Sequence, residues 1–149
     1  MTIASATSTS LGSFTLGINN LAVVAASVAA LVSGGLWYSP LLFGNAWIRL
    51  RGVTPGPEAG GRPPLGKVAA QFLRDLLVAY VLARFVVLLG VVDWVDAVYL
   101  GLAVGIGFQA TGIVGSVIHE DYPKQLFAIH VGDALVKTVI MAIILGVWR

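Results

Sequence analysis

The chain has 149 residues, of which 58% are hydrophobic and 11% charged, and its net charge is +2. Because a soluble domain carries about 25% charged residues, this composition excludes a water-soluble fold and predicts that a lipid bilayer surrounds the chain. The small net charge gives no indication of a nucleic-acid partner. The lack of cysteine excludes disulfides and thiolate metal sites.

The first 17 residues are rich in serine and threonine, and the first charged side chain of the sequence is Arg49. A secretory signal begins with a basic region, which this segment lacks. We therefore interpret residues 1–17 as a polar N-terminal tail and residues 18–149 as one membrane domain.

Four segments have the roughly 20 mostly apolar residues that a membrane helix needs. Asn20 is suited to cap the first of them, and Asp96 is suited to the start of the third. The sequence thus predicts an all-α integral membrane bundle of four transmembrane helices, with a short interfacial segment after the first. The expected spans are about 20–38, 68–89, 97–117 and 126–148.

Basic residues are unevenly distributed between the predicted loops. The second loop, residues 90–96, contains Asp93 and Asp96 and no base. Because basic loops stay in the cytoplasm, we expect the first and third loops to be cytoplasmic and both termini to lie outside. The bases of the first loop are Arg49, Arg51, Arg62 and Lys67.

An uncharged aromatic motif, GGLWYSPLLFGNAW, covers residues 34–47. A proline disfavours helix in the residue before it, so the first span should end near Pro40. The apolar residues that follow can then lie among the lipid headgroups, where Trp and Tyr are enriched. We interpret the motif as an anchor for the helix end, with ligand binding as the alternative. Its key residues are Trp37, Tyr38, Pro40, Phe43 and Trp47.

The motif WYSPLLFG followed by Trp47, together with the last-helix sequence HVGDALVKTVIMAIILGVW, resembles a family of small bacterial membrane proteins with four spans. That family is catalogued as domain of unknown function 1761, and the resemblance covers about residues 18–149. It implies a topology and a bacterial inner membrane, and it implies no activity.

Small residues form smooth faces on two predicted spans. On the first span, Ala26, Ala30 and Gly34 are four residues apart, and the third span has Gly101 and Gly105 at the same spacing. In lipid, such faces allow helices to approach closely. We favour packing within the chain over dimerisation as their role.

Ionisable residues inside the spans are the most informative feature. Asp75 and Asp133 each lie seven residues after the start of their span. At 1.5 Å per residue, both carboxylates should lie about 10 Å below the cytoplasmic surface. Arg74 can then pair with Asp133, and Lys137 with either acid, which offsets a cost on the order of 3 kcal/mol per lone charge. The predicted cluster comprises Gln71, Arg74, Asp75, His130, Asp133 and Lys137.

Two readings of this cluster remain open: it fixes the second span against the fourth, or it forms a proton or ion pathway. Arg84 and Gln109 lie away from it, and either side chain is a candidate for contact with a second chain. His130 alone is weak evidence for a haem or pigment ligand. His119, Glu120 and Asp121 are adjacent on a loop and do not converge on one metal ion, so we expect no cofactor.

The sequence favours a non-catalytic membrane protein that acts as an oligomer or as an accessory subunit of a larger membrane complex. The alternative is a dimeric proton-coupled transporter of a small solute or ion that works through Asp75, Asp133 and Lys137. A membrane enzyme has the least support, because no nucleophile lies near a base.

Overall fold

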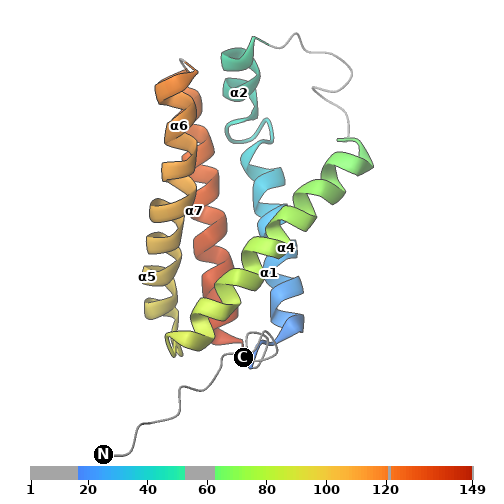
Figure 1. Cartoon of the computed structure of the whole chain (residues 1–149). Coiled ribbons are helices and arrows are strands. Elements are labelled where there is room, and N and C mark those ends of the chain that lie inside the picture. Colours follow the sequence, from blue (N-terminus) through green and yellow to red (C-terminus); the bar gives the residue numbers. More distant parts are fainter. Residues whose placement is uncertain (1–16, 53–62, 121, 149) are drawn as a thin grey trace, which may run out of the picture.

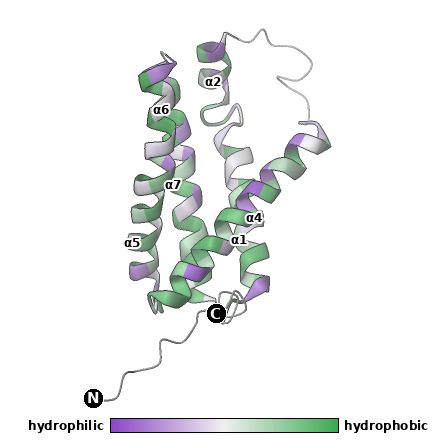
Figure 2. Cartoon of the chain, viewed as in Figure 1, coloured by the Kyte–Doolittle hydropathy of each residue, from purple (hydrophilic) through white to green (hydrophobic). Residues whose placement is uncertain are grey.

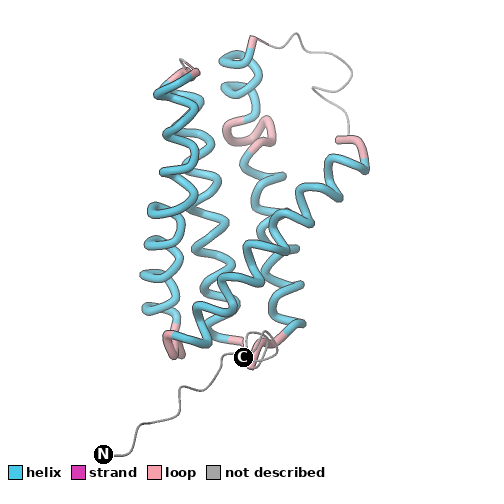
Figure 3. Tube along the Cα trace, viewed as in Figure 1, coloured by secondary structure: helices cyan, strands magenta, loops and turns pink. Residues whose placement is uncertain are grey.

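A computed structural model of the chain describes residues 17–52, 63–120 and 122–148. In these ranges every regular element is a helix, as the tube in Figure 3 shows. The predicted all-α class is therefore confirmed for the described residues. The elements are α1 (Asn20–Trp37), α2 (Gly44–Arg51), α4 (Leu65–Leu88), α5 (Trp94–Val104), the π-helical η2 (Gly105–Ala110), α6 (Thr111–His119) and α7 (Lys124–Val147).

The predicted cap of α1 is displaced by one residue, whereas Asp96 lies at the start of α5 as expected. Asn19, and not Asn20, caps α1: its Oδ1 accepts hydrogen bonds from Leu21 N at 3.0 Å and Ala22 N at 3.2 Å. Asp93 caps α5 in the same way, and Asp96 lies in the first turn. Both helices thus begin with a side-chain oxygen that satisfies otherwise unpaired backbone N–H groups.

Helix α7 is the centre of the bundle, since it contacts each of the other described helices. Figure 1 shows α1 and α5–α6 running beside it, with the start of α1 and the end of α7 at the same end of the molecule. Small residues allow these contacts. A Cβ added at Gly101 would lie 2.8 Å from Val139 Cα, and one at Gly105 would lie 2.8 Å from Leu135 Cδ2. The small faces predicted from the sequence are buried within the chain. They include Ala26, Ala30 and Gly34 of α1.

Three described helices, not four, are long and apolar enough to cross a membrane: Asn20–Trp37, Trp94–His119 and Lys124–Val147. The predicted second span corresponds to α4, which has 24 residues but carries four charged ones, Lys67, Arg74, Asp75 and Arg84. Figure 2 shows these hydrophilic positions along α4, whereas the other long helices are hydrophobic over most of their length.

Helix α4 is embedded over only part of its length. It crosses the bundle diagonally, and its N-terminal half diverges from the other helices (Figure 1). No residue of α4 before Asp75 is buried, whereas Asp75, Ala79, Leu82, Ala83 and Val86 form one buried face. The buried face of α4 therefore begins near its middle, at Asp75, and continues through its C-terminal half.

The predicted interfacial segment is a turn followed by a helix. After Trp37 the chain turns through residues 38–43 and then forms α2, which stacks beyond the end of α1 and runs along the bundle (Figure 1). Gly44 permits the turn, because a Cβ there would lie 2.7 Å from Ser39 O. The apolar residues Leu41 and Leu42 at the tip of the turn are exposed.

Candidate functional site

A buried ion pair lies inside the bundle, on one face of α7. Lys137 Nζ is 3.0 Å from Asp133 Oδ2, one helical turn away. Asp133 is only 8% exposed and Lys137 only 6%. Gly34 of α1 makes room for this pair, since a Cβ there would lie 2.6 Å from Lys137 Cε. The lysine side chain therefore packs directly on the backbone of α1.

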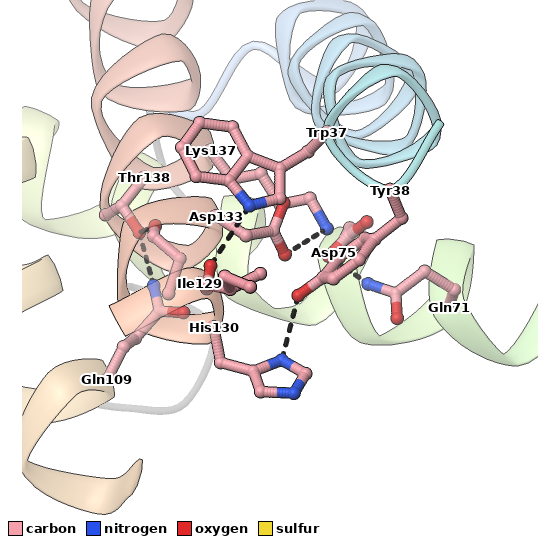
Figure 4. A network of polar contacts seen from close by, with 11 residues as sticks. Trp37, Tyr38, Gln71, Asp75, Gln109, Ile129, His130, Asp133, Lys137 and Thr138 are labelled. Atoms are coloured by element: carbon pink, nitrogen blue, oxygen red, sulfur yellow. Dashed lines mark hydrogen bonds and ion pairs between the residues drawn. The ribbon is translucent and has the colours of Figure 1, made fainter. Parts of the chain in front are cut away.

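Helix α4 contributes a second buried acid. Asp75 is 3% exposed, and its Oδ1 accepts a hydrogen bond from Gln71 Nε2 at 2.9 Å (Figure 4). Asp75 interacts electrostatically with Asp133. Asp75 Oδ2 and Asp133 Oδ1 are both buried and have no hydrogen-bond partner among the described residues. Lys137 thus pairs with Asp133, Gln71 bonds to Asp75, and each acid retains an unpartnered oxygen.

Arg74 does not form the predicted pair with Asp133. Its side chain lies on the exposed face of α4, and the described residues show no ion pair between the two. Its charge still acts on Asp133, Tyr38 and His130. The physical reason is that consecutive residues of a helix point about 100° apart, so that Arg74 faces outward where Asp75 faces inward.

The aromatic motif after α1 is part of the same site. Trp37 Nε1 donates a hydrogen bond to Ile129 O at 3.0 Å, and the ring of Trp37 packs against Gly132. Tyr38 Oη and His130 Nδ1 are 2.8 Å apart (Figure 4). The motif therefore attaches the end of α1 to α7, beside the Asp133–Lys137 pair.

The Tyr38–His130 contact allows two hydrogen-bond arrangements, which differ in the tautomer of His130. Tyr38 lies just beyond the span formed by α1, and burial, followed by the nearby Asp133 charge, raises the pKa of its phenol. We choose the arrangement in which the protonated phenol donates and His130 Nδ1 accepts. A neutral imidazole with an acceptor Nδ1 carries its proton on Nε2.

Gln109 has a partner in its own chain. Its Nε2 donates to the hydroxyl of Thr138, which is fully buried and itself donates to Ala134 O at 2.7 Å. The side chain of Gln109 therefore does not require a second chain as its hydrogen-bond partner. Arg84 is half-buried and also has an interaction partner. Thr138 was not predicted as a site residue, although it follows Lys137 directly.

The remaining sequence candidates do not gather into a site. His119 and Glu120 are exposed at the end of α6, and Asp121 lies outside the described residues. Within the described ranges, no three His, Cys, Asp or Glu side chains come together as metal ligands. A hollow at the opposite end of the bundle is lined by residues that include Gly17, Ala83 and Trp148, and none of the polar cluster lines it.

These features define a helical, membrane-embedded, multi-pass protein with an internal polar cluster. The chain belongs to the family described as "Protein of unknown function (DUF1761)", whose family model matches residues 21–146. No curated protein and no solved structure matches the chain.

Proposed function

We propose that this protein acts without catalysis, as an integral membrane subunit that associates with itself or with another membrane protein. The observation that carries this proposal is an open face of small residues on α6. Gly112 and Gly115 are three residues apart, and an added Cβ at either would have no atom within 4 Å. In lipid, such a face allows a second helix to approach closely. The glycines of α5, in contrast, are already used by α7.

Helix α4 is the fourth membrane crossing in this proposal. It connects α2 at one end of the bundle to the start of α5 at the other (Figure 1). Its acid, Asp75, is buried inside the bundle, which removes one part of the cost of placing α4 in lipid, and the exposed Arg74 remains as another part. The bases of residues 49–67 then put α2 on the cytoplasmic side of a bacterial inner membrane, with both termini outside.

Association is tested by native mass spectrometry after mild detergent extraction. We expect complexes larger than one chain, either homo-oligomers or a fixed stoichiometry with a second membrane protein. Gly112→Leu should dissociate them, because the larger side chain fills the open face. Ile106→Leu is the matched control on the exposed surface of η2. A single chain in every detergent and in nanodiscs would contradict the proposal.

Proton-coupled transport is a second candidate, favoured by one observation. Asp75 Oδ2 and Asp133 Oδ1 are buried without partners beside a single lysine. Carboxyl groups inside membrane spans often carry protons. The protein in this case moves a small solute or ion together with a proton that binds at the cluster.

Reconstitution into proteoliposomes tests this alternative. A proton or cation flux that disappears in both Asp75→Asn and Asp133→Asn supports transport. A lack of flux, together with a lower unfolding temperature in the variants, leaves the cluster with a packing role and supports the first proposal.

A further inference from the structure

Two buried N–H donors near α2 lack an acceptor. Trp47 Nε1 and His130 Nε2 are buried, and neither has a hydrogen-bond partner among the described residues. An indole nitrogen can act only as a donor, and His130 Nε2 carries the proton in the tautomer assigned above. Buried donors are almost always paired, so two of them in one place indicate a missing acceptor.

The ring of Tyr38 packs beside the rings of both Trp47 and His130. Its ring centroid is 6.1 Å from that of Trp47 and 5.8 Å from that of His130. Tyr122, just before α7, lies on the other side of His130 at 6.0 Å. In Figure 4, His130 Nε2 points away from Tyr38 and from the Asp133–Lys137 pair. The donor is thus directed out of the internal cluster.

Two arginines act on this place, and the exposed Glu120 also acts on Tyr122. The guanidinium carbon of Arg51 lies 5.2 Å from the ring centroid of Trp47, and its charge acts on both Tyr122 and His130. Arg74 also acts on His130. The acid that acts on His130 is Asp133, whose charge is already paired with Lys137. Both arginines are exposed, so their guanidinium groups are accessible from outside the bundle.

We propose that Trp47, His130 and Arg51 bind a phosphate group, which an anionic phospholipid headgroup or inorganic phosphate can supply. Phosphate oxygens accept hydrogen bonds from both ring N–H groups, and a guanidinium group pairs with phosphate through two parallel hydrogen bonds. Trp47 lies in α2 and Tyr38 just beyond α1, in the segment that the sequence predicts to lie among the lipid headgroups. The lipid is therefore the favoured source. This site is separate from the open glycine face of α6.

Lipid titration of the delipidated protein in detergent tests the proposal, with binding followed by native mass spectrometry. The three probes are phosphatidylglycerol, phosphatidylcholine and inorganic phosphate. We expect phosphatidylglycerol to bind most tightly. Trp47→Phe keeps an aromatic ring but removes the N–H, and the loss of one hydrogen bond to a charged group should weaken binding roughly tenfold. Trp94→Phe, an exposed tryptophan at the opposite end of the bundle, is the matched control and should bind as the wild type does.

Arg51→Gln provides a second variant on an exposed side chain, so its effect does not depend on folding of the interior. We expect it to reduce phosphatidylglycerol binding as well. Inorganic phosphate that binds with the same dependence on Trp47 and Arg51 supports the site and assigns the free anion as its ligand. Equal binding of all lipids to the wild type, Trp47→Phe and Arg51→Gln would overturn the proposal, because the two donors would then be satisfied by water.

Discussion

At the scale of single residues, Lys137 has the most demanding environment. It is a buried cation that contacts one acid and rests on a glycine of the neighbouring helix. The sequence predicted that Lys137 pairs with an acid but left both Asp75 and Asp133 open as its partner. The role of Gly34 was not predictable, because it depends on which residue of α1 faces Lys137 across the interface.

Replacement of Lys137 should destabilise the fold strongly. In Lys137→Met, Asp133 loses its only ion-pair partner among the described residues, and breaking a buried pair in this way costs about 3–5 kcal/mol. Lys124→Met, at the exposed start of α7, should leave stability unchanged. Unfolding of both variants in the same mild detergent measures the difference. Equal stability of the two would mean that the pair contributes nothing.

Trp37 connects the aromatic motif of residues 34–47 with the polar cluster on α7, although the sequence analysis interpreted the two separately. The sequence suggested an interfacial anchor, whereas the indole N–H bonds to the backbone of α7. This contact could not be predicted from the sequence. Its acceptor is a backbone carbonyl, Ile129 O, and every residue type has such a group.

Trp37→Phe should cost about 1 kcal/mol in stability, the usual value of one hydrogen bond. Part of the ring contact with Gly132 remains in this variant. Trp148→Phe, an exposed residue after α7, is the comparison. A thermal unfolding shift confined to Trp37→Phe would confirm the role of the bond, and identical shifts in both variants would argue against it.

At the scale of elements, the interface between α5 and α7 depends on glycine. Gly101→Ala should destabilise the protein by about 1–3 kcal/mol, because the added methyl group meets the backbone of α7 at Val139. Gly112→Ala adds the same methyl group where the surroundings are open, so it should be neutral or slightly stabilising. Unfolding of the two variants is the measurement. A destabilised Gly112→Ala beside an unaffected Gly101→Ala would contradict the described packing.

Hydropathy located the three apolar helices closely, since their pattern is a property of each segment alone. It did not predict the π-helical turn in Gly105–Ala110, which places Gln109 against Thr138. The tilt of α4 was equally hidden, because it follows from contacts with α1 and α7 and not from the composition of α4. The π-helical turn and the tilt of α4 therefore depend on tertiary packing, which the sequence pattern does not show.

At the scale of the whole molecule, the proposals require α4 to cross the bilayer and carry Asp75 into its interior. In that arrangement, the turn between α4 and α5 lies on the opposite side of the membrane from α2 and the end of α6. Because the chain has no cysteine, single cysteines can be introduced without background labelling. Suitable exposed positions are Asn45, Val92 and His119.

The most direct measurement is therefore the labelling of these cysteines in intact vesicles with a membrane-impermeant maleimide. We expect Asn45→Cys and His119→Cys to react from one side of the membrane and Val92→Cys from the other. Opposite sides for Val92 and His119 would establish the crossing by α5–α6 and serve as the internal control. Reaction of Asn45→Cys and Val92→Cys from the same side would show that α4 does not cross, and would contradict the account.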